Sequence, residues 1–312
     1  MEQYILSRNS KCKVIIGFGS WAKRDVWPLQ WLMIVKTVKM FGIILCNSNR
    51  DIVKLNWDHR YKKSSDTVYS WKNRVLVIIS QRIEVLRTFA LSRVYYVASI
   101  LPLGTSMVKK FKTLMGKFIW SFSGKLLRIS MEDLKNPKLS GGLKLPCISK
   151  MSNALLTSQC VRLIRSGDRK TLRHLDYWLG DLLGFLSTDY TTGTVAADTP
   201  VYFEKVGMLL TDLMIPDALN ASNISSITNK YIYQVFMSGL SPPKVVREAN
   251  QDYRKVWKRL YTVMDSISRE TLFLLIHNKL PVPERLFRIA VKRDPYCERC
   301  IEAHISDLEH YG

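Results

Sequence analysis

The segment from Trp71 to Trp120 constrains the fold of this chain more than any other stretch of its sequence. In its first half, apolar residues recur at every third or fourth position, which is the period of one face of an α-helix. These residues are Val75, Ile79, Ile83, Leu86, Ala90, Val94 and Val97. Pro102 has no backbone N–H and biases Leu101 away from helical angles, so the helix should end there. A second helix, capped by Thr105 or Ser106, is expected to continue to Trp120.

The cations of this segment fall outside the apolar stripe, which predicts that they lie in solvent. They are Arg74, Arg82, Arg87, Arg93, Lys109, Lys110, Lys112 and Lys117. Residues 71–170 contain 19 Lys or Arg but only 4 Asp or Glu, and the whole chain carries a formal net charge of +21. Such a field attracts polyanions, so we predict that these eight residues bind nucleic acid. One alternative stays open, a packed hairpin with a merely solvated basic face. A module recruited to anionic membranes is disfavoured by the lack of a basic amphipathic terminal anchor, so we expect no membrane partner.

The composition sets wider bounds. With 312 residues, 47% of them hydrophobic, the chain is long enough for two or three globular domains. It contains no run of 18 apolar residues, so we expect no membrane-spanning helix. The N-terminus lacks the apolar segment of a secretory signal, which predicts an intracellular protein, nuclear or cytoplasmic and not secreted. Six cysteines are ordinary usage and fit a reducing compartment.

In the rest of the chain, glycine, proline and small polar residues mark the expected boundaries between secondary-structure elements. Two β-rich runs, 13–19 and 38–45, are expected to pair as strands, and 49–70 to be a polar connector. After Trp120 we expect a short strand at 126–131, a turn-rich loop at 135–143 and a helix at 146–166. A looser insertion with short helices should follow at 185–243. The last part, 248–293, should be amphipathic helix with a break at 280–283.

Four stretches, in this order, resemble the part of a non-LTR (LINE-type) retrotransposon polyprotein that lies beyond its polymerase active site. They are Val38–Ile44, Trp71–Trp120, Pro137 with Gly141-Gly142-Leu143-Lys144-Leu145-Pro146, and Leu280-Pro281 through Asp294-Pro295-Tyr296-Cys297-x-x-Cys300. The first is similar to the strand-turn that closes the palm of these reverse transcriptases. The third resembles the family's loop that ends in a Gly-Gly-Leu-Gly-Leu-Pro pattern.

The resemblance implies a mainly α fold in four parts. These are a short N-terminal β remnant of a polymerase palm (1–60), a basic helical thumb and connection (61–170), a variable helical insertion (171–244), and a helical segment with a partial zinc-binding domain (245–312). It implies a fragment of an RNA-directed DNA polymerase that binds RNA template and RNA/DNA duplex through the thumb. The alternative is a non-enzymatic basic nucleic-acid-binding protein derived from a retrotransposon.

The resemblance stops short of the catalytic chemistry. Reverse transcriptases use paired aspartates to hold two divalent metal ions, and this chain contains no Asp-Asp pair. We therefore expect a fragment of a 5′-truncated element, or a gene model that covers only the 3′ part of one. It should have no catalytic residue and no polymerase activity alone, and magnesium would belong to the intact parent enzyme. No motif indicates a small-molecule substrate.

The Cys297-x-x-Cys300 pair has the spacing of a metal-binding knuckle, and zinc favours such thiolate ligands. The resemblance adds His310 as a third ligand, so Cys297, Cys300 and His310 form an incomplete site that would bind zinc weakly. His304 is the alternative that would close the site. Two free structural thiols are the simpler interpretation.

Overall fold

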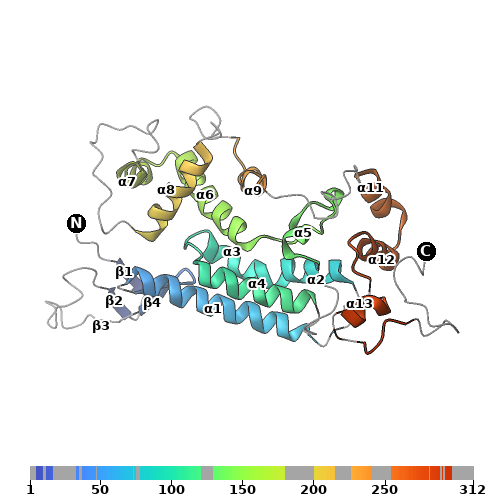
Figure 1. Cartoon of the computed structure of the whole chain (residues 1–312). Coiled ribbons are helices and arrows are strands. Elements are labelled where there is room, and N and C mark those ends of the chain that lie inside the picture. The colour runs from blue at the N-terminus through green and yellow to red at the C-terminus, as the bar shows by residue number, and fades with distance from the viewer. Residues whose placement is uncertain are drawn as a thin grey trace. The chain divides into compact units, whose positions relative to one another are not determined.

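The structure is a computed structural model, and within the residues that it describes the chain is mainly helical, with short strands near the N-terminus (Figure 1). The described residues are 5–9, 12–16, 33–34, 37–46, 48–72, 74, 78–120, 129–179, 200–214, 226–239, 254–280, 282–288, 290 and 292–296. No helix in this part of the chain is both long and apolar enough to cross a membrane.

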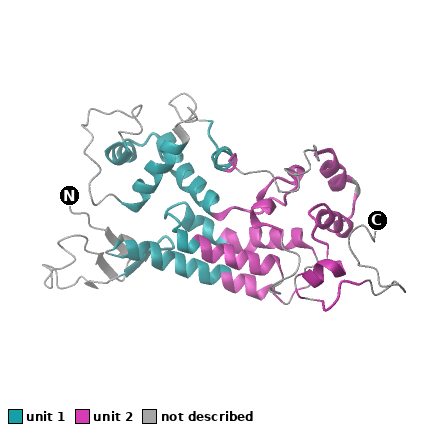
Figure 2. Ribbon diagram, in the orientation of Figure 1, with its two compact units in different colours: residues 1–64, 93–107, 149–236 teal, residues 65–92, 108–148, 237–312 magenta. Residues whose placement is uncertain are grey.

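The chain divides into two compact units, and each is assembled from separate stretches of sequence (Figure 2). Unit 1 comprises residues 1–64, 93–107 and 149–236, and unit 2 comprises residues 65–92, 108–148 and 237–312. The helices that span a boundary belong to both. The four predicted domains, with boundaries after residues 60, 170 and 244, are continuous stretches of sequence assigned by expected function. They are not the same divisions as the two compact units, and they stay a prediction.

The strands lie at the N-terminal end of unit 1. Strand β1 (Ile5–Asn9) pairs antiparallel with β2 (Cys12–Ile16), and β2 pairs in parallel with β3 (Met33–Ile34). Strands β4 (Thr37–Met40) and β5 (Ile43–Cys46) form a separate antiparallel hairpin. The expected pairing of 13–19 with 38–45 is therefore wrong, because the second run contains two strands and their turn.

That turn consists of Phe41 and Gly42, which have positive φ angles of 47° and 79°. Positive φ at both central residues is what a tight two-residue hairpin turn requires. The hydroxyl of Tyr96 donates to the carbonyl of Phe41 at 2.6 Å, and Arg60 donates to the carbonyl of Gly42 at 3.2 Å. The predicted strand-turn is confirmed as a local structure.

Residues 49–70, expected to be a polar connector, form the 22-residue helix α1 (Asn49–Ser70). Its buried side carries Asn56 and Ser64 as well as Trp57, so the apolar period is interrupted in the sequence. The Asn56 amide accepts a hydrogen bond from the backbone N–H of Ile44 at 2.8 Å and donates to the Ile44 carbonyl at 2.7 Å. The helix is thus docked on β5 by a polar side chain, which apolar periodicity does not detect.

The apolar stripe after Trp71 forms a helix, as predicted, but with a later start and a local change of pitch. Helix α2 (Ile79–Val85) continues into the π-helical segment η2 (Leu86–Leu91) and then into α3 (Ser92–Ala98). The stripe is buried at Ile79, Ile83, Leu86, Ala90, Val94 and Val97. Val75 lies outside the described residues.

The break at Pro102 and the second helix are confirmed. Helix α4 runs from Thr105 to Ile119, so Thr105 and Ser106 lie within its first turn and the expected cap at either residue is wrong; the residue before the helix is Gly104. Its buried stripe consists of Met107, Phe111, Leu114, Met115, Phe118 and Ile119. In unit 1, the indole N–H of Trp57 donates to the carbonyl of Pro102 at 2.9 Å, which ties the break to α1.

The larger core of unit 1 is helical. Helix α6 (Ile148–Ser166) confirms the helix predicted there, and it packs with α7 (Arg169–Leu179), α8 (Val201–Met214) and α9 (Asn229–Met237). The core residues with no more than 2% exposure are Ala154, Leu156, Cys160, Val161, Leu175, Val206, Leu209, Leu210 and Ile232. The insertion predicted from 171 to 244 is therefore helical where the structure describes it.

Unit 2 adds shorter elements around α2 and α4. They are α5 (Met131–Lys135), the 3₁₀ turn η3 (Lys138–Ser140), α11 (Arg254–Val263), α12 (Ser266–Ile276) and α13 (Pro283–Arg288). The strand expected at 126–131 fails at its C-terminal end, because Met131 opens a helix capped by the Ser130 hydroxyl. Its residues 126–128 lie outside the described part. The break expected at 280–283 separates α12 from α13.

Candidate nucleic-acid interface

Helix α4 separates its apolar and basic residues onto opposite sides. At 100° per residue, Lys109, Lys110, Lys112 and Lys117 occupy the half of the helix circumference opposite the buried stripe. All four lysines are exposed. The aliphatic side anchors the helix in unit 2, so the ammonium groups remain in solvent.

The ammonium group of Lys112 faces an acid of helix α5. Its ammonium nitrogen lies 3.7 Å from the Glu132 carboxylate, which Lys135 also contacts at 2.6 Å. Burial raises the pKa of Glu132, but the hydrogen bond and charge of Lys135, with the charge of Lys112, outweigh it and lower that pKa overall. Lys112 therefore helps to hold α5 against α4, and a phosphate would compete with Glu132 for it.

Arg82 and Arg87 make structural contacts that their helical positions do not predict. Arg82 is partly buried, contrary to the prediction, whereas 39% of the Arg87 side chain remains exposed. The guanidinium of Arg82 is partly buried and donates to the carbonyl of Ile119 at 2.7 Å, so it closes the C-terminal end of α4. Arg87 forms an ion pair with Glu84 at 2.8 Å and donates to the carbonyl of Lys144 at 2.8 Å. Periodicity places these residues beside the stripe but does not show the carbonyls that they reach.

Arg74 and Arg93 are exposed, as predicted. The Arg74 guanidinium stacks over the indole of Trp71 at 4.2 Å from the ring centroid, and Trp71 in turn contacts Phe89 at 5.1 Å. Arg93 belongs to unit 1, whereas the other seven predicted residues belong to unit 2. The structure thus brings Lys109, Lys110 and Lys117 together on one face of α4 and leaves Arg93 to the other unit.

The loop that resembles the family's glycine-rich motif is a packed structural element. Leu143 and Leu145 both donate backbone N–H groups to the carbonyl of Leu134, at 3.0 and 2.9 Å. A Cβ on Gly142 would lie 2.1 Å from the carbonyl oxygen of Asn136, a distance at which the backbone would have to move. The glycine is therefore required by close backbone approach.

The neighbouring Gly141 contacts residues from the C-terminal part of unit 2. It has a φ of 82°, and a Cβ there would lie 3.1 Å from the Trp257 ring. Its carbonyl contacts the Nε2 atom of His277 at 3.0 Å, and since a carbonyl only accepts, Nε2 carries the proton. The His277 ring lies 4.5 Å from that of Phe273. The loop is thereby fixed to helices α11 and α12.

A second basic surface, on unit 1, was missed by the sequence analysis. The pKa of the His59 imidazole is lowered by desolvation first, and then by the charges of Lys63, Arg60, Lys39 and Lys62. These cations come from α1 and β4, and they gather because α1 is a helix. The signal that would have found them is helical spacing of basic residues in the stretch interpreted as a connector.

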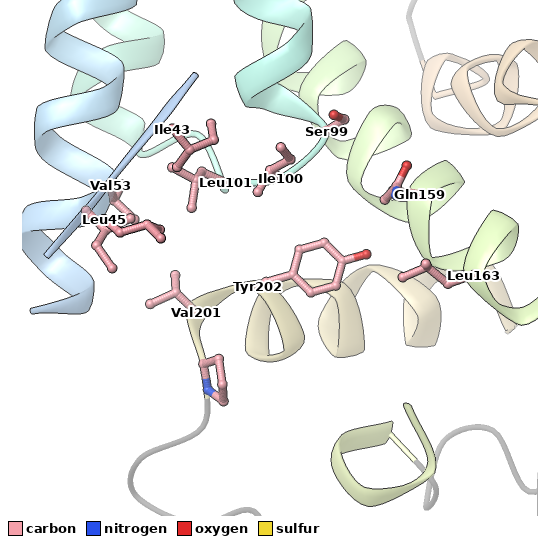
Figure 3. A pocket seen from close by; sticks show the side chains of 12 residues that line it. Ile43, Leu45, Val53, Ser99, Ile100, Leu101, Gln159, Leu163, Val201 and Tyr202 are labelled. Carbon is pink, nitrogen blue, oxygen red and sulfur yellow. The ribbon is translucent and has the colours of Figure 1, made fainter. Parts of the chain in front are cut away.

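Unit 1 also contains a pocket of about 350 Å³, which is lined in part by Ile43 and Leu45 of the β4–β5 hairpin (Figure 3). Its wall is largely apolar, with Ile43, Leu101 and Val201 among the side chains that line it. Tyr202 contributes a hydroxyl whose pKa is raised well above its usual value by burial, and which donates to the carbonyl of Leu156 at 3.4 Å. Among the described residues that line the pocket, none carries a charged side chain.

No group of three or more His, Cys, Asp or Glu side chains among the described residues is arranged to hold a metal ion. Cys297, Cys300, His304 and His310 lie outside the described residues, so the incomplete zinc site stays a prediction. Cys46, Cys147 and Cys160 are buried thiols that form no disulfide, and burial raises the pKa of Cys160 to about 12. That thiol is therefore protonated and unreactive.

No protein-family model matches this chain, and no curated protein sequence matches it either. The assignment of function therefore depends on the geometry of the two units and on the motifs in the sequence.

Proposed function

We propose that this chain binds the sugar–phosphate backbone of nucleic-acid duplexes, including RNA/DNA hybrids, through the basic face of α4. In this proposal it is the post-catalytic part of a non-LTR retrotransposon reverse transcriptase, with unit 2 built around the thumb. Lys109, Lys110 and Lys117 contact phosphates, and Arg74, stacked on Trp71, extends the contact. Such contacts carry affinity without sequence information.

The observation that carries the proposal is the one-sided charge of α4. Six apolar residues of the helix are buried on one side, and its lysines are exposed on the other. Lys109 and Lys117 are eight residues apart, or about 12 Å along the helix axis at the α-helical rise. This spacing lets one helix reach several phosphates, because a duplex carries one charge per about 1.7 Å of its axis.

Polymerase chemistry is not part of the proposal for the isolated chain. Two-metal catalysis needs paired carboxylates, and the sequence has no Asp-Asp pair. Magnesium-dependent primer extension by the purified chain would contradict this. A non-enzymatic binding protein derived from a retrotransposon has the same binding surface, and the two differ in the parent gene rather than in this chain's own contacts.

The test is the salt dependence of binding to a fluorescent RNA/DNA hybrid of arbitrary sequence. We expect the affinity to fall steeply with salt, and the combined variant Lys109→Gln, Lys110→Gln, Lys117→Gln to reduce the slope of log K against log salt by about 2 to 3, at about 0.9 per lost phosphate contact. The matched control removes three exposed cations of α7 instead: Arg169→Gln, Lys170→Gln, Arg173→Gln.

The control should leave the slope unchanged, since α7 lies in the other unit and carries no predicted contact. An affinity that does not vary with salt would overturn the proposal. Equal loss in the α4 and α7 variants would show that net charge, and not the α4 face, governs binding.

A further inference from the structure

Helix α11 also divides into an apolar side and a cationic side. In this ten-residue helix Trp257 is fully buried and Leu260 is 4% exposed. Lys255, Lys258 and Arg259 are exposed and, at 100° per residue, point away from the buried pair. The sequence contains no acid between Arg254 and Val263 that would neutralise this side.

The cationic side destabilises the helix that carries it. Lys255 and Arg259 stand at i and i+4, where like charges cost about 0.2–0.5 kcal/mol in helices. Lys255 also lies in the first turn, where the helix dipole disfavours a positive charge. Within the described residues no ion pair is formed by Lys255, Lys258 or Arg259. Folding of unit 2 therefore gives no reason for three adjacent cations.

The helix itself is held firmly, so its cations are presented in a fixed arrangement. Trp257 packs against Gly141 and lies 5.9 Å from the Phe273 ring and 6.1 Å from the His277 ring, measured between centroids. Tyr261 lies beneath Lys138, whose ammonium nitrogen is 5.2 Å from the ring centroid. Lys138 is exposed, and it adds a cation from η3 beside the cationic side of α11.

The burial of the apolar side distinguishes between polyanions. A basic amphipathic helix binds a membrane by inserting its apolar side among the lipid chains. In α11 that side is occupied by protein, because Trp257 and Leu260 are packed inside unit 2. Apart from Val256, which is 46% exposed, the accessible surface of α11 is mainly its charged side, which fits a partner with a charged and hydrated surface.

We propose that a second nucleic-acid-binding surface of unit 2, in addition to the basic face of α4, binds the phosphate backbone. It consists of Lys255, Lys258, Arg259 and Lys138. Lys255 and Arg259 are about 6 Å apart along the helix axis at the α-helical rise, so one strand contacts both. This surface rests on the proposed function and extends it: unit 2 binds nucleic acid at α4 and at α11, and both contacts contribute to the salt dependence.

The test uses the full chain and the same RNA/DNA hybrid. The variant Lys255→Gln, Lys258→Gln, Arg259→Gln should reduce the slope of log K against log salt by about 2 to 3. Its thermal stability should equal or exceed that of the unaltered chain, since repulsion within α11 is removed. The α7 variant Arg169→Gln, Lys170→Gln, Arg173→Gln is the control and should keep the original slope.

Three outcomes would overturn the proposal. If the α4 variant lowers the slope and the α11 variant does not, the proposed function stands and this second surface is wrong. If neither the unaltered chain nor any variant shows salt dependence, the proposed function itself fails. If the α11 variant keeps its affinity for nucleic acid but loses binding to vesicles containing phosphatidylserine, the partner of α11 is a membrane.

Discussion

The carboxylate of Glu270, on α12, accepts a hydrogen bond of 2.6 Å from the backbone N–H of Ile79, 191 positions earlier in the chain. Ile79 is the first residue of α2, and the residue before it, Ile78, offers no side-chain cap. The first N–H groups of a helix have no partner within the helix, so Glu270 supplies from α12 what the local sequence lacks. The contact ties the C-terminal helices of unit 2 to its apolar stripe.

Two substitutions of Glu270 distinguish the effect of its hydrogen-bond acceptor from the effect of its charge. We expect Glu270→Ala to lower the free energy of unfolding by about 1–2 kcal/mol, because the Ile79 N–H loses its partner. Glu270→Gln keeps an acceptor oxygen and should cost less. Urea unfolding of both variants, followed by circular dichroism, measures the difference. Equal losses in the two variants would show that the charge, and not the hydrogen bond to Ile79, matters.

The same pair predicts a pH effect. Burial raises the pKa of Glu270 above its ordinary value, although the Ile79 N–H and Arg82 act in the opposite direction. An acid whose pKa is raised on folding stabilises the fold when protonated, and this contribution is lost as the pH rises through the folded-state pKa. The unaltered chain should therefore gain stability relative to Glu270→Gln as the pH falls from 8 towards 5. A difference that does not vary with pH would contradict the assignment.

The glycine-rich loop gives a sharper prediction. Gly142→Ala should destabilise unit 2 by about 3 kcal/mol or prevent its folding, because the new Cβ would lie 2.1 Å from the carbonyl oxygen of Asn136. Gly239→Ala is the matched control, since a Cβ there meets no atom within 4 Å. Thermal unfolding of both variants makes the comparison. A Gly142→Ala chain as stable as the control would show that the loop is not held as described.

The sequence predicted those helices whose buried residues are continuous apolar stripes. The break at Pro102 and the helix that follows it are predictable from local rules, because a proline inside a helix removes a backbone hydrogen bond and clashes with the preceding turn. Helix α1 was missed because Asn56 and Ser64 occupy its buried side. Asn56 is satisfied partly within the helix, by the Ile52 carbonyl, and partly by the backbone of Ile44, which lies outside it and cannot be inferred from helical periodicity.

The residues of the candidate interface likewise fall into those that could be predicted from the sequence and those that could not. Lys109 and Lys117 were predicted correctly as exposed because their partner is solvent, and exposure follows from helical position alone. Arg82 was not, because its partner, the carbonyl of Ile119, is 37 positions away. Periodicity indicates which face a residue occupies, but not which distant backbone atoms approach that face.

His277 should make unit 2 sensitive to acid. Its pKa is lowered from the ordinary value of 6.5, chiefly by burial and also by the charge of Lys279, against the opposing effects of the Gly141 carbonyl and Asp133. A base whose pKa is lowered on folding favours the fold while it is neutral, and this stability is lost as the pH falls below its unfolded value.

We therefore expect the urea midpoint of the unaltered chain to be lower at pH 5 than at pH 7.5. His277→Gln, which retains an N–H for the Gly141 carbonyl but does not titrate, should show a smaller change over the same interval. Amide hydrogen exchange of residues 136–146 would report the loosening directly. If both chains change equally with pH, another group is responsible.

At 100° per residue, Gly116 lies between Lys112 and Lys109 around the axis of α4, and a Cβ there would meet nothing within 4 Å. Glycine inside a helix costs about 1 kcal/mol relative to alanine, so Gly116→Ala should raise the free energy of unfolding by about that amount. Packing thus gives no reason for the glycine, whereas the proposed binding of a phosphate backbone close to α4 would give one. Gly116→Leu should keep the fold yet weaken binding of the RNA/DNA hybrid about tenfold, or about 1.4 kcal/mol. Fluorescence anisotropy and thermal unfolding of both variants test this together, and a Gly116→Leu chain that binds as tightly as the unaltered one would place the nucleic acid away from this face.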